Sequence, residues 1–408
     1  MSSPCYATLP CGLRLVAIHR PGAVADHCGV TVRAGSRDEA PGFYGLAHFV
    51  EHTIFKGTPR RRSWHILNRM ESIGGELNAY TTKEETVVYT TYPSGALDRA
   101  LDLLADLVQH SIFPTAEIDR ERQVVEDEID TYLDIPSEGI FDDYDELIYA
   151  GTELAHPILG SRESIQRLTS DVCREYLRRY YTPANMVLFY SGAEAPERVA
   201  ARAARYFTQA APADAVAASR PVSVKPGRET FDTVREIGTH QAHTVLGSLV
   251  AGMYSPDRYA LALLTNIIGG PGMNSLLNVA LRERRGLVYT VDASLSQLTD
   301  TGLFSIYYGC DTEDVERCRR LATEIITSLA ETPLTPRRLD AAKRQYLGQM
   351  ALSSTNTEQA ALSASRSTLL RGRVLTRTEI TEAILALTPT DLLTAASSLL
   401  PLSRLTLR

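Results

Sequence analysis

His48-Phe49-Val50-Glu51-His52 is the stretch from which the fold and the chemistry of this 408-residue chain can be argued. The residues around it, 46–55, have a helix-like composition. Because positions four apart lie on one face of a helix, His48 and His52 can direct two imidazoles at a single metal ion. Glu51 projects from the adjoining face. The pattern therefore predicts a metal site on a short helix.

The types of residue in this stretch favour zinc-dependent hydrolysis. Two histidines and a carboxylate leave a zinc position open for water, whose pKa the metal lowers to about 7. A nearby glutamate that is not a ligand, here Glu51, can take the proton as the hydroxide attacks a carbonyl. The His-x-x-Glu-His order is the inverzincin signature. The alternative is a pair of histidines on a helix surface.

Composition and charge limit the classes of function. The 44% hydrophobic and 22% charged content is typical of a soluble globular protein, and the length suggests two or three domains. A net charge of −7 gives no basic footprint and argues against a nucleic-acid partner. The chain has no run of eighteen apolar residues, which argues against a membrane span and a membrane partner. Residues 1–5 lack the features of a secretory signal. We therefore expect a cytoplasmic protein.

A β-hairpin is predicted at residues 76–92 from their alternation and their Thr, Val and Tyr content. Asn78 and Ala79 lie on its first arm. A strand beside a peptidase site can pair with an extended substrate through main-chain hydrogen bonds, although a purely structural strand fits the pattern equally well. Ser63 is predicted to cap the helix at 64–73, which precedes this hairpin. The other predicted elements of this half are strands at 13–19 and 28–34 and helices at 46–55, 64–73, 97–112 and 115–132.

The helix predicted at 115–132 carries a line of acids. Glu117, Glu121 and Glu128 are spaced by four and seven residues, so they share a helical face. Such a stripe is usually a solvated surface. The two-histidine site, however, needs a third protein ligand, and a carboxylate is the missing type. The spacing alone leaves these readings open.

Taken together, these motifs resemble the M16 metallopeptidases, the family of pitrilysin, insulin-degrading enzyme and mitochondrial processing peptidase. The first motif continues as Phe55-Lys56-Gly57-Thr58, and Glu128 follows His52 by 76 residues, the family's distance to its third zinc ligand. The resemblance implies one Zn²⁺ per catalytic domain, held by His48, His52 and Glu128. It further implies that Glu51 is the general base and that Glu121 orients the site from the second layer.

Substrate contacts are implied in the same way. Residues 74–81 resemble the family's substrate-facing edge strand, which favours a binding role for Asn78 and Ala79. Glu138 and Asp142 match acids that read a basic substrate residue in processing peptidases, although an acidic pair four apart on a helix is commonly just solvated.

The second half is predicted to be a related domain without zinc. An Ala/Pro/Ser-rich linker at 212–227 separates domain 1–211 from domain 228–408. Residues 321–350 faintly repeat the helix–proline–helix pattern of 101–129. The resemblance implies an α+β fold: two homologous α/β-sandwich domains, each a largely antiparallel sheet packed with helices.

Arg282 and Tyr289 correspond to family residues that contact the substrate near its scissile bond. A cation and a phenol suit an oxyanion, whereas a surface arginine and a core tyrosine are the alternative. Longer M16 enzymes join four such domains, so two imply a second subunit. The expected assembly is a homodimer in which the partner's C-terminal domain completes the site, with a heterodimer as the alternative.

The sequence thus predicts a zinc endopeptidase that cuts peptides or unfolded polypeptides in a closed chamber. One alternative is a non-catalytic assembly or core subunit, a role that some M16 relatives serve. Another is a zinc site that only holds the fold, although structural sites are usually closed by four ligands, often cysteines.

Overall fold

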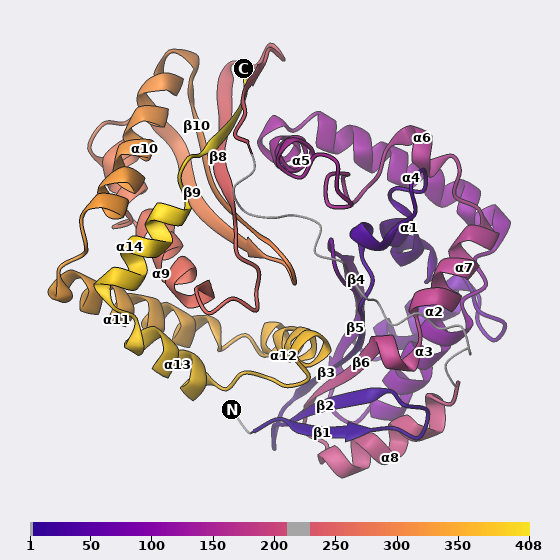
Figure 1. Cartoon of the computed structure of the whole chain (residues 1–408). Helices are drawn as coiled ribbons and strands as arrows, with labels where there is room; N and C mark the ends of the chain where they lie inside the picture. Colours follow the sequence, from indigo (N-terminus) through magenta and orange to yellow (C-terminus); the bar gives the residue numbers. More distant parts are fainter. Residues whose placement is uncertain (1–2, 210–228) are drawn as a thin grey trace. The chain divides into compact units, whose positions relative to one another are not determined.

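The computed structural model describes residues 3–209 and 229–408, which form a mixed α/β fold with two separate sheets (Figure 1). These residues divide into two compact units. The first takes 3–130, 156–209 and 354–375, and the second takes 131–155, 229–353 and 376–408. The predicted linker, 212–227, lies outside the described residues. The predicted fold class is confirmed.

The first sheet has the strand order β1-β2-β6-β3-β5-β4. Only β2 and β6 pair in parallel, and the other neighbours are antiparallel. Among the described strands, β4 pairs with β5 alone and is therefore an edge strand. The hairpin predicted at 76–92 is confirmed as β4 and β5. The strands are β1 Cys5–Thr8, β2 Arg14–His19, β3 Ala25–Val32, β4 Glu76–Thr81, β5 Thr86–Pro93 and β6 Met186–Gly192.

Both faces of the first sheet are covered. Because side chains alternate along a strand, β3 sends Cys28 and Val30 into the main core of this unit, on the side of α3 (Leu97–His110). Thr31, which follows Val30 and points to the opposite face, faces α12 (Thr357–Arg371), where its hydroxyl lies 2.6 Å from the hydroxyl of Ser365. The remaining helices of this part are α1 Leu46–Thr53, α2 Ser63–Glu71, α4 Thr115–Leu133, α6 Arg162–Ile165, α7 Ser170–Tyr180 and α8 Pro196–Tyr206.

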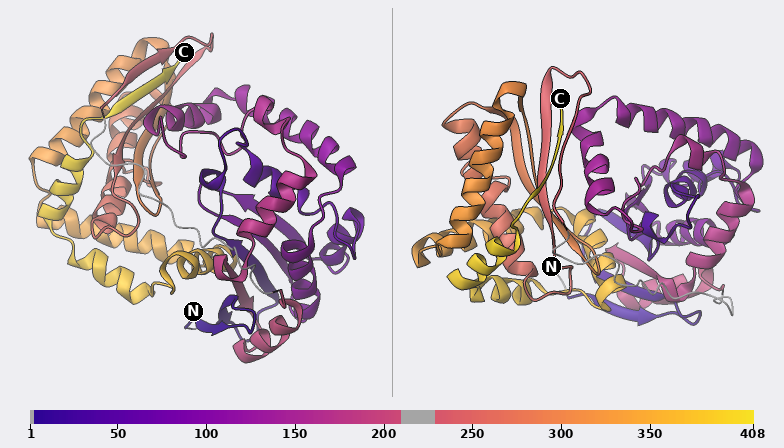
Figure 2. Two further views of the ribbon diagram at one scale, coloured as in Figure 1. Left: turned by 45° about the vertical axis from the view of Figure 1, so that its right-hand side comes forward. Right: turned by 45° about the horizontal axis from the view of Figure 1, so that its top comes forward.

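The second sheet has the order β7-β11-β8-β10-β9, with only β7 and β11 in parallel. Alternate residues of β8 and β10 again face two cores. One lies under α9, α10 and α14, and the other lies under α5. In Figure 2, α10 is the orange helix and α14 the yellow helix of this part of the chain. The elements are β7 Asp232–Arg235, β8 Gln241–Val250, β9 Val288–Gln297, β10 Gly302–Asp311, β11 Ser403–Leu407, α5 Pro136–Ile148, α9 Arg258–Gly269, α10 Val315–Glu331, α11 Pro336–Ser353, α13 Arg377–Ala386 and α14 Pro389–Ser398.

Each sheet thus receives one covering helix from the other half of the sequence. Helix α5 precedes the predicted linker but packs on β8 and β11, whereas α12 follows it and packs on β3 and β6. The boundaries drawn from composition, 1–211 and 228–408, do not anticipate this exchange. Within the described ranges, no helix combines the length and hydrophobicity needed to cross a bilayer.

One local prediction is wrong. Helix α2 begins at Ser63 itself, after Arg62 at the N-cap, so Ser63 is not the cap, and within the described residues no side chain caps this helix. The neighbouring Arg61 is only 11% exposed, because its guanidinium binds the carboxylates of Asp102 and Asp106 on α3. Of the three consecutive arginines at 60–62, Arg61 is therefore held against α3 rather than in solvent.

Candidate metal centre

Helices α1 and α4 bring the three predicted ligands together. The Nε2 atom of His48 lies 3.7 Å from Oε2 of Glu128, and Nε2 of His52 lies 3.5 Å from the same oxygen. The two imidazole centroids are 4.5 Å apart. Glu117, the remaining acid of the predicted stripe, pairs instead with Arg120. Of the three acids of the predicted stripe, Glu128 is the one whose oxygen approaches both histidines.

These three residues fit a zinc ion. Each offers one atom, and the three atoms lie within 4.8 Å of one another, the one such cluster among residues 3–209 and 229–408. Bonds of about 2.0–2.2 Å to a tetrahedral zinc place ligand atoms about 3.3–3.6 Å apart, close to the two distances above. Burial is the main cause that lowers the pKa of His48 to about 3, and the nearby His52 contributes a smaller part. Its imidazole is thus neutral and can donate a lone pair.

Glu121 lies behind His52, on the side away from Glu128. Its Oε2 is 3.4 Å from Nδ1 of His52, and its Oε1 is 2.6 Å from the ammonium of Lys56. A carboxylate on the second ring nitrogen fixes the tautomer and the orientation of a ligating histidine. Lys56 belongs to the first motif, but the sequence predicted no role for it. Its place four residues after His52, just beyond the end of α1, was the available signal.

Glu51 is half-buried beside the cluster and accepts a hydrogen bond of 2.8 Å from the hydroxyl of Thr81. Burial raises the pKa of Glu51, and Glu128 adds to this, whereas the Thr81 bond and His52 lower it. Thr81 is the last residue of the edge strand β4, so this strand ends next to the predicted base. The sequence places Thr81 at the end of the edge strand predicted at 74–81 but gives no sign of its contact with Glu51.

The other predicted residues fall into two groups. Asn78 and Ala79 lie on β4 and are partly buried. Glu138 and Asp142 lie on α5, and Arg282 and Tyr289 lie at Asn278–Glu283 and on β9, so these four belong to the second compact unit.

Tyr289 is 55% exposed and is therefore not a core residue. Its hydroxyl donates to Oδ1 of Asp311 at 2.8 Å, and this bond raises the pKa of the phenol. Arg282 is also exposed. Both side chains can therefore be reached from solvent in this chain.

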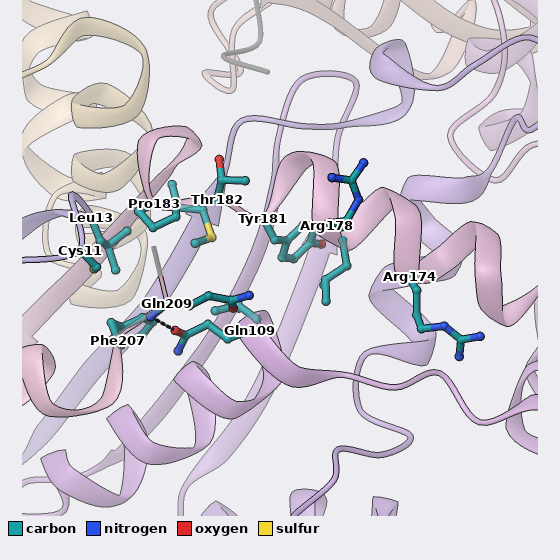
Figure 3. Close-up of a pocket in the computed structure, with 13 residues that line it drawn as sticks. Cys11, Leu13, Gln109, Arg174, Arg178, Tyr181, Thr182, Pro183, Phe207 and Gln209 are labelled. Atoms are coloured by element: carbon teal, nitrogen blue, oxygen red, sulfur yellow. Dashed lines mark hydrogen bonds between the residues drawn. The ribbon is translucent and has the colours of Figure 1, made fainter. Parts of the chain in front are cut away.

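A separate pocket of about 290 Å³ lies in the first unit (Figure 3). It has a mostly apolar lining that includes Leu13, Val108 and Phe207, with Arg174 and Arg178 also among its residues. None of the predicted site residues lines it. The metal cluster is therefore distinct from this pocket.

Comparison with known proteins agrees with the geometry. Residues 14–162 match the family model for insulinase, peptidase family M16, and residues 167–346 match the model for the peptidase M16 inactive domain. The chain is 30% identical to an uncharacterized zinc protease of Streptomyces coelicolor, over 96% of this chain and 86% of that protein. An uncharacterized zinc protease of Bacillus subtilis is 31% identical, over 90% and 89%. The chain belongs to peptidase family M16.

Solved structures share the fold of this M16 chain. A protease from Helicobacter pylori superposes with a TM-score of 0.92 at 22% identity, covering all of both chains. A chain from Pseudomonas fluorescens, described as a peptidase M16 inactive domain, has a TM-score of 0.91 at 19% identity and covers 99% of this chain and 97% of that one. At these identities the likeness concerns the fold alone.

Proposed function

We propose that this M16 protein is a zinc-dependent endopeptidase. The observation that carries the proposal is the meeting of His48, His52 and Glu128 around one point, with Glu51 next to them. Three protein ligands leave a coordination position open, as in catalytic zinc sites, whereas structural sites are closed by four. The zinc-protease names of the relatives support the same metal and the same class of reaction.

The chain's own residues then have separate tasks. His48, His52 and Glu128 hold the ion, which when bound supplies a Lewis acid that lowers the pKa of water. Glu51 accepts the proton of the attacking water and returns it to the leaving amine. Glu121 holds the ring of His52 in one orientation.

The edge strand offers a place for the substrate. An extended peptide can add to the open side of β4 through main-chain hydrogen bonds at Asn78 and Ala79, and β4 leads to Thr81 beside Glu51. This mode needs an unfolded backbone and no free terminus, which favours internal cleavage of peptides or unfolded polypeptides. The family resemblance adds a closed chamber, and a preference for basic residues read by Glu138 and Asp142.

The family resemblance also motivates a shared site. In this proposal the chain forms a homodimer, and Arg282 and Tyr289 of each C-terminal domain donate to the oxyanion at the partner's zinc centre. A heterodimer with a zinc-less sister subunit is the alternative. The exposure of both side chains supports their availability to a partner or a substrate.

The Glu51→Gln variant tests the hydrolase. A peptide library is incubated with wild-type and variant protein, each with and without a chelator, and the products are sequenced by mass spectrometry. We expect chelator-sensitive cleavage by the wild type and a loss of about 10²–10⁴-fold in kcat for Glu51→Gln. Zinc content, measured in parallel, should be unchanged, because Glu51 is not a ligand.

Two results would contradict the proposal. Zinc binding without cleavage of any library peptide would favour the non-catalytic subunit. Unfolding of the protein on removal of zinc, again without cleavage, would favour a purely structural site.

A further inference from the structure

The first turn of helix α1, which carries His48 and His52, is capped by a side chain from outside the helix. Its first turn has N–H groups without partners inside the helix, and Gly45 at the N-cap has no side chain to satisfy them. The two carboxyl oxygens of Glu39 accept hydrogen bonds at this end of the helix. Oε2 accepts from the N–H of Gly45 at 2.8 Å, and Oε1 accepts from the N–H of Ala47 at 2.7 Å. Ala47 directly precedes the ligand His48.

The capping carboxylate is itself held by a histidine. The Glu39 side chain is fully buried, and its Oε2 lies 3.0 Å from Nε2 of His156, which is 9% exposed. The same nitrogen lies 2.9 Å from the carbonyl oxygen of Ser36. Because a backbone carbonyl can only accept, Nε2 carries the hydrogen and donates to Ser36, and it thus also faces Oε2 of Glu39 as a donor. The His156 ring also stacks on Tyr44, with centroids 4.1 Å apart.

The chain after His156 is pressed against the start of α1. The hydroxyl of Ser164 donates to the carbonyl of Tyr44 at 2.6 Å. A Cβ on Gly160 would lie 2.3 Å from the same carbonyl, and a Cβ on Gly45 would lie 2.5 Å from the carbonyl of Leu159. This close approach fixes the place where α1 begins.

The position of the helix start matters because α1 has only eight residues. So short a helix is marginal by itself, so its position depends on the contacts around it. A negative charge near the first turn of α1 also interacts favourably with the helix dipole and so stabilises the helix. Burial raises the pKa of Glu39, whereas the bonds from His156, Ala47 and Gly45 lower it.

We infer that Glu39 and His156 are positioning residues, which hold the first turn of α1 so that His48 meets His52 and Glu128 at metal-binding distance. The inference rests on the proposed zinc site. Neither residue touches the metal ligands' side chains in the contacts described above. Their effect passes through the backbone of Gly45 and Ala47.

A matched control separates positioning from stability. Arg37 and Glu84 form a second buried ion pair in the same unit, with atoms 2.7 Å apart and side chains 0% and 1% exposed. We compare Glu39→Gln, His156→Phe, His156→Gln and Glu84→Gln. His156→Phe keeps an aromatic ring against Tyr44 but loses the donor, whereas His156→Gln keeps an N–H donor.

The readouts are the zinc dissociation constant in competition with a chromophoric chelator, the visible spectrum of the Co²⁺-loaded protein, and Tm. We expect Glu39→Gln and His156→Phe to weaken zinc binding about tenfold or more and to alter the cobalt spectrum. His156→Gln should restore most of the affinity. Glu84→Gln should lower Tm and leave the affinity and spectrum of the wild type.

Unchanged zinc affinity in Glu39→Gln, or equal affinities in the two His156 variants, would overturn the inference. If Glu39→Gln does not fold, the comparison of His156→Phe with His156→Gln decides it. Failure of the wild-type protein itself to bind zinc would instead overturn the proposed function, so the two failures are distinguishable.

Discussion

Glu51 illustrates how single contacts set the chemistry of the candidate site. Burial and the charge of Glu128 hold its pKa above the ordinary value, while the hydroxyl of Thr81 and the nearby His52 act in the opposite direction. A general base works best when its pKa lies near the operating pH. In the proposed mechanism, the hydroxyl at position 81 would therefore tune the pKa of the base, in addition to its place on the edge strand.

Replacing Thr81 by Val should move the pH profile of cleavage. The substitution removes a donor that stabilises the charged carboxylate, so the pKa of Glu51 rises further. Because Glu51 acts in its deprotonated form, the acidic limb of the kcat/KM profile should shift to higher pH. Thr81→Ser keeps the hydroxyl and should retain the wild-type limb. An unshifted limb in Thr81→Val would show that this bond does not set the titration of the base.

For single residues, the sequence predicted neighbours where spacing within one helix was enough. The i, i+4 relation of His48 and His52 placed both rings on one face. The number of residues that separates the second histidine from the third ligand in the family then pointed to Glu128. Thr81 and Glu39 were not found, because their partners come from other elements and a lone threonine or glutamate carries no pattern.

At the level of elements, ion pairs connect α3 to the loop that follows α1. The Asp106 side chain is fully buried, accepts from the hydroxyl of Thr58 at 2.8 Å and binds the guanidinium of Arg61. Arg61 also binds Asp102, which Arg69 of α2 contacts at 3.0 Å. Two carboxylates of α3 thus hold the loop and α2 in place.

The Asp106→Ala variant should be strongly destabilised. Removing one partner of a buried ion pair typically costs about 3–5 kcal/mol, and because Arg61 keeps its contact with Asp102 we expect a loss toward the lower end of that range. Urea unfolding followed by circular dichroism measures the change. Asp119→Ala is the control, because Asp119 pairs with Arg122 on the surface and is 63% exposed, so its loss should cost at most about 1 kcal/mol. Equal losses in the two variants would contradict a structural role for the buried pair.

Sequence patterns predicted the elements better than their partners. Periodicity located α3, α4 and the β4–β5 hairpin, because these signals are local. The exchange of α5 and α12 between units was not predicted, because nothing in their own residues specifies which sheet they cover. The burial of Arg61 was missed for the same reason: its acids lie some forty residues away on α3.

For the whole molecule, the two units repeat one design with different chemistry. Each has a largely antiparallel sheet covered by helices on both faces, and the metal cluster found in the described residues lies in the first unit alone. The three clustered residues lie outside residues 167–346, the range that matches a model named for an inactive domain, although that range also includes residues 167–209 of the first unit. The substrate contact and assembly proposed above are assigned to the second unit, whose described residues hold no such cluster.

Mixing two inactive variants tests whether subunits share a site. Glu51→Gln lacks the base, and Arg282→Ala lacks a donor whose loss should cost about 10²–10³-fold. In a two-fold dimer with site sharing, each mixed dimer holds one intact site, so an equal mixture should regain about a quarter of wild-type activity. Exchange is verified with two affinity tags. Verified mixed dimers without regained activity would mean that each zinc centre uses no Arg282 from its partner.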